Sequence, residues 1–144
     1  MARGISAKSL APVEDNGLSV GAPPFIYHKN ISGVAADETI EIVSKSEFKF
    51  RVIDCWAVAN ADMTSSETLR IDDMAVDAAG APDPNAIVTA FAIGAGGNET
   101  GDIFRAAEIN AAYNDIDKGG GLQVFVNYNS VTVEADVYVM CVRV

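Results

Sequence analysis

The single histidine, His28, is the first residue to consider as a general base or a metal ligand. Catalysis needs a nucleophile beside a base, two carboxylates in different environments, or a bound metal. His28 follows Tyr27 near a predicted first strand, and the sequence offers it no candidate partner. We therefore expect His28 to be a surface or interface residue. Metal sites of the cupin and β-barrel dioxygenase type need two or three histidines, so the sequence excludes them.

The two cysteines, Cys55 and Cys141, each lie in an apolar, strand-like run. A structural zinc site needs four ligands, which two cysteines and one histidine do not supply. A disulfide would require the two strands to lie side by side with suitable geometry. We expect two buried thiols that act as small apolar side chains, with the disulfide as the alternative.

Asp54 is the charged residue that fits its surroundings least well. It lies between Val52 and Trp56 on the apparent core face of a strand, and a buried carboxylate is costly unless it accepts hydrogen bonds or meets a cation. We expect a bend or bulge that turns Asp54 to solvent, or a structural hydrogen bond, in preference to a catalytic role. Trp56 is then expected to be a core anchor, and a carbohydrate platform is the weaker alternative.

Oxygen ligands suited to calcium occur in or near predicted loops at Asp72, Asp73, Asp77, Asp83, Asn114, Asp115 and Asp117. None follows the EF-hand spacing, so turns and helix or strand caps are the expected role. The glycine-rich segment 94–98 lacks the lysine of a Walker loop and is predicted to be a flexible loop. The sequence therefore predicts no cofactor, no metal and no catalytic residue, and we expect a chain that is not an enzyme.

The composition of the chain argues against some classes of binding partner. The chain has 144 residues, 49% hydrophobic and 21% charged, which fits one domain with a substantial core. Its net charge of −10 argues against nucleic-acid binding, which depends on Lys and Arg neutralising phosphates. No apolar run approaches the roughly 20 residues that cross a bilayer, and no secretory signal is visible, so a membrane partner is not expected.

Alternation of apolar and polar residues predicts the strands that position these side chains. The segment 48–58 alternates in this way, with Phe48, Phe50, Val52, Trp56 and Val58 on the apolar side. In the last segment the residues predicted to face one way are Val131, Val133, Ala135, Val137, Val139 and Cys141, and those predicted to face the other are Thr132, Glu134, Asp136, Tyr138 and Met140. Segments 122–128 and 131–143 are predicted to form a hairpin around 129–130. The apolar end of the outer face, at 138–144, predicts packing against a second sheet or a subunit interface.

Shorter strands are predicted at 25–29, 38–43, 67–72, 86–92 and 102–105, and a short connecting helix at 106–113. About eight strands with almost no helix predict an all-β fold, an antiparallel β-sandwich and most simply a jelly roll, over residues 25–144. Residues 1–24 show no helical or strand period and are predicted to form an extended, irregular arm that contacts a neighbouring subunit or a partner, with a frayed terminus as the alternative. The candidate interface residues are Leu10, Val13, Leu18, Val20, Phe25, Tyr27, Tyr138 and Met140.

Five segments, 50–59, 86–90, 109–113, 120–124 and 137–144, resemble the capsid decoration (cement) proteins and related head-fibre bases of tailed bacteriophages. The resemblance covers roughly residues 46–144 and lies in strand ends, without a catalytic signature. It implies a β-sandwich that assembles as a homotrimer on the exterior of the virion and ties neighbouring copies of the major capsid protein together. It also implies assembly in the host cytoplasm and a tethering role for the arm. The alternative is a receptor- or glycan-binding β-sandwich module, and a β-sandwich hydrolase is the least favoured.

Overall fold

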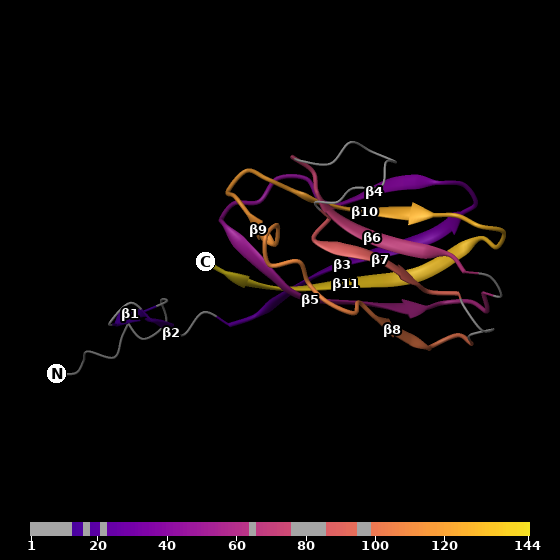
Figure 1. The fold of residues 1–144 in the computed structure, drawn as a ribbon, viewed down its shortest axis with the longest axis horizontal. Coiled ribbons are helices and arrows are strands. Elements are labelled where there is room, and N and C mark those ends of the chain that lie inside the picture. Colours follow the sequence, from indigo (N-terminus) through magenta and orange to yellow (C-terminus); the bar gives the residue numbers. More distant parts are fainter. Residues whose placement is uncertain (1–12, 16–17, 21–22, 64–65, 76–85, 95–98) are drawn as a thin grey trace.

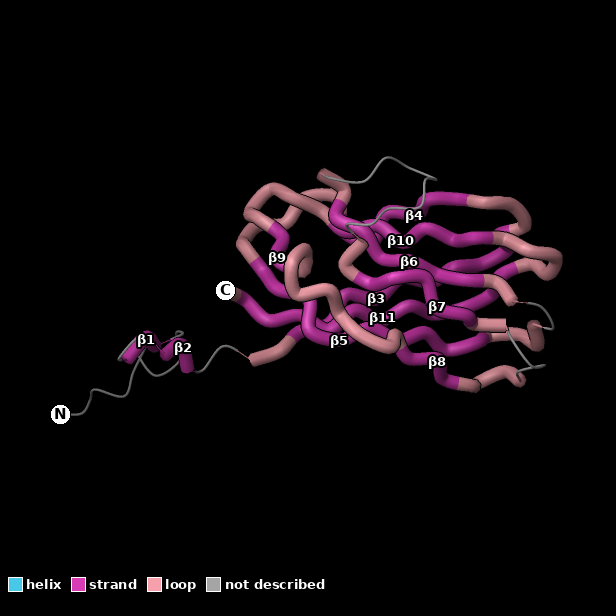
Figure 2. The backbone as a smooth tube through the Cα atoms, in the orientation of Figure 1, coloured by secondary structure: helices cyan, strands magenta, loops and turns pink. Residues whose placement is uncertain are grey.

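Two antiparallel β-sheets pack face to face in the computed structural model, which describes residues 13–15, 18–20, 23–63, 66–75, 86–94 and 99–144 (Figures 1 and 2). One sheet has the order β3 (Phe25–Val34), β11 (Val133–Arg143), β5 (Phe50–Ala59) and β8 (Ile103–Arg105), and β9 (Asp115–Ile116) pairs with the start of β5. The other has the order β4 (Glu38–Val43), β10 (Leu122–Asn127), β6 (Thr68–Asp73) and β7 (Val88–Ala92). The predicted all-β sandwich is confirmed.

The strand pairing is that of a jelly roll. β3 pairs with β11, β4 with β10, β5 with β8 and β6 with β7, so that each successive pair from the two ends of the domain is nested inside the last. Such a chain is a long double ribbon rolled into a barrel-like sandwich. The four ribbon pairs alternate between the two sheets, which explains why neighbours in the sequence often lie in different sheets.

The core lies between the sheets and takes alternate residues from each strand. The fully buried side chains include Val52, Cys55, Ala57, Leu69, Ile71, Val124, Val126, Val137 and Val139. On β11 the predicted inward set from 133 to 141 is confirmed, since every second residue there is fully buried. The central strands β10 and β6 are buried on both faces, so this sheet has little exposed outer surface at its centre.

The predicted hairpin of 122–128 with 131–143 is wrong. β10 pairs with β4 and β6, whereas β11 pairs with β3 and β5 in the opposite sheet. Ser130 and Val131 lie in the connection, and their backbone N–H groups donate to Oε1 of the buried Glu67 at 3.0 and 2.9 Å. These two hydrogen bonds fix the backbone of the connection where the chain passes from one sheet to the other. A hairpin would have a tight turn at this place.

The predicted helix at 106–113 is also wrong, because this segment forms turns. Asn110 Oδ1 accepts a hydrogen bond from the N–H of Ala112 at 3.1 Å, and the Asn110 carbonyl accepts from Tyr113 at 3.1 Å. A side chain that bonds its own backbone in this way competes with helical hydrogen bonding. No helix long and apolar enough to cross a lipid bilayer occurs within the described ranges.

The N-terminal segment differs from the irregular arm that the sequence predicts, because it contains two short strands. β1 (Val13–Asp15) and β2 (Leu18–Val20) pair antiparallel, with Val13 opposite Val20. Figure 1 shows this pair apart from the sandwich, at the end where β3 begins and β11 finishes. Leu10 lies outside the described residues.

Candidate functional site

A β-bulge in β5 determines which side chains reach the outer surface. Asp54 lies opposite Met140, but Val52 lies opposite Cys141, so Ile53 has no opposite residue. The alternation therefore shifts by one residue after Val52. The predicted bend or bulge at Asp54 is confirmed. Its carboxylate is partly exposed and accepts hydrogen bonds from its neighbour's backbone N–H at 2.8 Å and from the Arg105 guanidinium at 2.5 Å.

Trp56 consequently lies on the outer face, and the prediction of a core anchor is wrong. It is half-buried, whereas Cys55 and Ala57 on either side of it are fully buried. Trp56 was expected to point inward because the alternation of Phe50 and Val52, continued without the shift, places it on the core face.

Four side chains form a row across the outer face of the β3-β11-β5-β8 sheet. His28 lies opposite Tyr138, Tyr138 opposite Trp56, and Trp56 opposite Arg105. The His28 and Tyr138 rings stack at 4.8 Å, and the Tyr138 and Trp56 rings stack at 5.6 Å with an interplanar angle of 13°. The Arg105 guanidinium lies 5.2 Å from the Trp56 ring centroid. We call this surface the ladder face; it comprises these four residues and their outward-facing neighbours Ile26, Ile53, Asp54, Val58, Ile103, Asp136 and Met140.

Asp136 is the polar centre of the ladder face. Its carboxylate accepts hydrogen bonds from Asn60 Nδ2 at 2.8 Å and Asn30 Nδ2 at 3.0 Å, and His28 Nε2 lies 2.7 Å away. The Asn60 and Asn30 amides, followed by His28, hold the pKa of Asp136 below its ordinary value, because they favour the charged carboxylate. The network fixes the orientation of His28, so His28 has a structural partner that the sequence did not reveal.

Replacing Asp136 with asparagine is expected to flatten the dependence of stability on acid pH. Because the folded-state pKa is lowered, the unfolded chain binds the proton first as the pH falls. The stabilisation is therefore present above the ordinary carboxyl pKa of about 3.9 and is lost as the pH falls through the lower folded-state value. Asp136→Asn should cost about 1 kcal/mol near neutral pH, and this difference should shrink below about pH 4. Denaturant unfolding at several pH values measures it.

Asp117→Asn is the matched control for that experiment. The Asp117 side chain is 88% exposed, and its cation, Lys49 Nζ, lies 3.8 Å away. A small difference from wild type is expected for this variant, because an exposed ion pair contributes little to stability. A loss at Asp136 that stayed constant down to about pH 3 would contradict the assigned cause.

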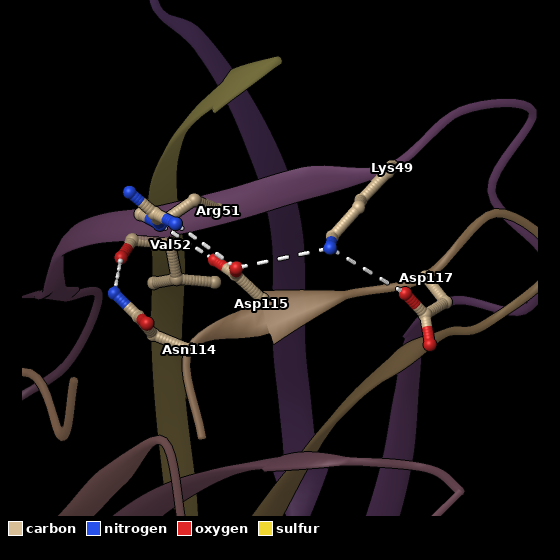
Figure 3. Close-up of polar contacts among 6 residues, drawn as sticks. All are labelled: Lys49, Arg51, Val52, Asn114, Asp115 and Asp117. Carbon is tan, nitrogen blue, oxygen red and sulfur yellow. Dashed lines mark hydrogen bonds and ion pairs between the residues drawn. The ribbon is translucent and has the colours of Figure 1, made fainter. Parts of the chain in front are cut away.

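A second cluster of charges fastens β9 to the start of β5 (Figure 3). Arg51 donates to both carboxylate oxygens of Asp115, at 2.5 and 3.0 Å, and Lys49 lies 4.0 Å from the same carboxylate. Asn114 Nδ2 donates to the Val52 carbonyl at 2.9 Å, and the Val52 N–H donates to the Asn114 carbonyl at the same distance. The Arg51 hydrogen bond lowers the pKa of Asp115. The Asp115 carboxylate is therefore paired with two cationic side chains, those of Arg51 and Lys49.

The remaining candidate calcium ligands that the structure describes make structural contacts. Asp72 bonds Arg70 Nε at 2.9 Å, Asp73 accepts from the Ala75 N–H at 2.8 Å, and Asp77 and Asp83 lie outside the described residues. The described parts of the chain contain no group of three Asp, Glu, His or Cys side chains arranged to hold a metal ion. Residues 95–98 of the glycine-rich segment also lie outside the described residues.

Both thiols are buried and unpaired with each other, which confirms the preferred prediction. Cys55 lies opposite Val139 and Cys141 opposite Val52, so neighbouring strands do not bring the two sulfurs face to face. Burial raises the pKa of Cys55 to about 12, with smaller contributions from Asp54 and Cys141, and burial raises that of Cys141 to about 12. Neither thiol is ionised near neutral pH, which makes both poor nucleophiles.

The interface candidates separate into three groups. Tyr138 and Met140 lie on the ladder face, on the outward side of β11 as predicted. Phe25 and Tyr27 point inward and are half-buried in an edge-to-face cluster with the rings of Phe48 and Phe50. The backbones of Val13, Leu18 and Val20 belong to the β1–β2 pair. Trp56 and Arg105 belong to the same surface as Tyr138 but were not among the residues predicted to form it.

Comparisons with known proteins add little to this picture. No protein-family model matches the chain. No curated protein matches it in sequence either. A solved structure of infectious bursal disease virus, Gx strain, is similar over 91% of this chain and 36% of that chain, with 10% sequence identity and a TM-score of 0.36. The chain thus spans about a third of that chain's length. So low a TM-score does not indicate a shared fold, and the jelly roll rests on the strand pairing.

Proposed function

We propose that this chain is a non-enzymatic virion structural protein that decorates the exterior of a phage capsid. In this proposal it assembles as a homotrimer in the host cytoplasm and ties neighbouring major capsid subunits together. The resemblance of residues 46–144 to decoration proteins suggests the role. The supporting observation is a jelly-roll sandwich that carries a separate N-terminal β1–β2 pair outside its core.

The jelly roll supports a binding or structural role without specifying one, since viral capsid and lectin domains both use it. The β1–β2 pair adds a feature that a decoration protein would use. An N-terminal segment anchored outside the sandwich can reach a neighbouring subunit, and three such segments on one trimer multiply modest affinities. Buried, unpaired thiols also suit assembly in a reducing cytoplasm.

Among the described residues, the candidate catalytic side chains make contacts that do not assemble a nucleophile with a base. Asp54 bonds Arg105, both cysteines are buried with raised pKa values, and the His28–Asp136 pair lies against the Tyr138 ring. A hydrolase would need one of these groups to be poised beside a nucleophile or water-binding site. The arrangement therefore favours a structural protein over a β-sandwich hydrolase.

The native mass of the full-length protein tests the proposal. Light scattering after gel filtration should give about 45 kDa, three times the 15.1 kDa chain. Removing residues 1–24 should abolish co-sedimentation with shells of the matching major capsid protein, because the arm supplies part of the tether. A full-length monomer that leaves the shells unbound would contradict the proposal.

A glycan-binding module is the second candidate, favoured by Trp56 and Tyr138 beside the carboxylate and amides around Asp136. Sugars bind proteins by stacking on an open aromatic face, but both faces of Trp56 are covered, by Tyr138 and by Arg105. Tyr138 is covered in the same way by Trp56 and His28. A saccharide array that shows binding lost in Trp56→Ala would favour this candidate over decoration.

A further inference from the structure

The two lateral sides of the sandwich, where the edge strands of one sheet meet those of the other, are closed to different extents. On the β7–β8 side, the segment 106–113 links the two sheets. The Ala106 N–H donates to the Cys55 carbonyl at 3.1 Å, and the Asn110 N–H donates to the Ile87 carbonyl at 2.8 Å. On the other side the edge strands are β3 and β4, and no backbone hydrogen bond among the described residues joins these two strands.

The core-facing residues of β3 become less buried with distance from the turn that joins β3 to β4. Ile31, near that turn, is fully buried. Phe25, Tyr27 and Lys29, toward the start of the strand, are only partly buried, although every residue opposite them on β11 is fully buried. We call this surface the β3–β4 edge; it comprises the partly buried residues Phe25, Tyr27, Lys29, Ile40, Val43 and Phe48.

The β3–β4 edge is apolar and aromatic, with one cation. The Phe25 ring packs edge to face against those of Tyr27 and Phe48. Lys29 forms no ion pair within the part of the chain that the structure describes. β3 is ten residues long and, among the described strands, pairs only with β11, so the backbone groups along its outer edge are open to an added strand. A strand that carries apolar side chains and a carboxylate would fit this surface.

The β1–β2 pair has this composition. Its six residues include the apolar Val13, Leu18 and Val20 and the carboxylates of Glu14 and Asp15. A two-stranded hairpin is only marginally stable in water and needs a surface to pack against. Figure 1 shows the pair apart from its own sandwich. The chain therefore carries both a strand pair that lacks cover and a surface that fits such a pair.

The connection to β3 directs the β1–β2 pair away from its own sandwich. Pro23 and Pro24 immediately precede β3. Each proline ring fixes its own φ near −65° and restricts the residue before it to extended conformations, so that two consecutive prolines favour an extended polyproline segment over a turn. Docking on β3 of the same chain would need a reversal at these residues. A neighbouring copy offers the same β3–β4 edge without that reversal.

We propose that the β1–β2 pair of one copy docks on the β3–β4 edge of the next copy, where it adds a strand to β3 and brings its carboxylates to Lys29. This contact is heterologous, because it joins two different surfaces, and such contacts close into a ring when the rotation between copies allows. In a ring of three, every β1–β2 pair and every β3–β4 edge is used once. The inference rests on the self-association in the proposed function and names the two surfaces responsible.

Photo-cross-linking of the full-length protein tests the contact directly. A benzophenone side chain replaces Leu18 in β2, and isotope-labelled and unlabelled chains are refolded together, irradiated and digested. We expect cross-links from position 18 to the segments 25–29 or 40–43, with many of them joining a labelled chain to an unlabelled one. Cross-links confined to chains of the same label would place the pair on its own sandwich and overturn the inference.

Reversal of one charge, with a matched control, tests the same contact without a probe. Lys29→Glu should weaken association about tenfold or more, because it replaces attraction to Glu14 and Asp15 by repulsion. Adding Glu14→Lys and Asp15→Lys to that variant should restore association, which a merely structural loss would not allow. Lys118→Glu is the control, since Lys118 is exposed and the variant has the same net charge. Light scattering over a dilution series should leave the control at the wild-type value, and an equal loss in the control would overturn the inference.

The outcomes separate this inference from the proposed function. A trimer whose cross-links from position 18 reach the ladder face, or reach no second copy, overturns the inference and leaves the trimer standing. Cross-links to the major capsid protein on assembled shells, with none to a second copy of this chain, overturn the inference and leave decoration standing. A full-length monomer that leaves the shells unbound contradicts the proposed function as well.

Discussion

Replacing Asp72 with leucine is expected to lower the free energy of unfolding by about 3–5 kcal/mol. Asp72 is fully buried on β6, and Arg70, two residues earlier on the same face, is 6% exposed. Both Asp72 oxygens accept from Arg70 Nε at 2.9 Å, and Arg70 Nη2 lies 2.9 Å from Oδ2. Removing the carboxylate takes the Asp72 counter-charge away from a buried guanidinium, and the unfavourable burial of that positive charge is the source of the loss.

A double-mutant cycle separates the pair from its surroundings. The double variant Arg70→Met with Asp72→Leu should recover part of the lost free energy of unfolding, because two apolar side chains need no counter-charge. The recovery should be incomplete, since the contact of Arg70 with the Phe125 ring, at 4.8 Å, is also removed. Asp115→Leu is the control: its Arg51 pair has similar geometry but is exposed, so only a small fraction of the Asp72 effect is expected. Equal losses at Asp72 and Asp115, measured by denaturant unfolding, would contradict the role of burial.

Strand positions were predictable where alternation is strict and uninterrupted. The strand at 38–43 begins and ends at the predicted residues, and the inward set of β11 is as predicted. In β5 the prediction failed at a single residue. The extra residue, Ile53, moves every later side chain to the opposite face, and the polar Asp54 on an apolar face was the signal that marked it.

Pairing between distant strands was not predictable in the same way. The short connection at 129–130 favours a hairpin on local grounds, yet the chain changes sheets there. A signal was present, because β10 is apolar at Leu122, Val124, Phe125 and Val126, which is typical of a strand buried on both faces. β11 alternates strictly and has one exposed face. Adjacent strands with such different patterns seldom share one surface.

The candidate site could be predicted only in part, because it also depends on the pairing of distant strands. Tyr138 and Met140 were identified from one strand, but the row through His28, Trp56 and Arg105 depends on the register of β3, β5 and β8 against β11. Registers between strands far apart in the sequence are set by packing of the whole core. Residue types alone therefore indicated an outward apolar patch and left its composition open.

Gly121→Ala is expected to lower the free energy of unfolding by about 3 kcal/mol or more, the upper end of the cost of overpacking. Gly121 is buried just before β10, between the end of β4 and the residue after β6. A Cβ there would lie 2.4 Å from the Val43 carbonyl oxygen and 2.8 Å from that of Ser44, with Met74 Sδ at 2.7 Å. The Met74 side chain can turn away, but backbone oxygens move only with their strand. β4 is held against β10, where Val43 lies opposite Leu122.

Gly119→Ala, two residues earlier, separates this steric effect from backbone strain. Gly119 has a φ of +86°, and a Cβ at this position would meet no atom within 4 Å, so the cost comes from the left-handed backbone alone, about 1–2 kcal/mol. Denaturant midpoints measured at one fixed protein concentration compare the variants, because the proposed self-association would add to apparent stability. Similar losses of unfolding free energy at the two glycines would show that the end of β4 moves to make room for the Cβ. A markedly larger loss at Gly121 would show that the backbone where β4, β10 and β6 meet is too rigid to make room for a Cβ.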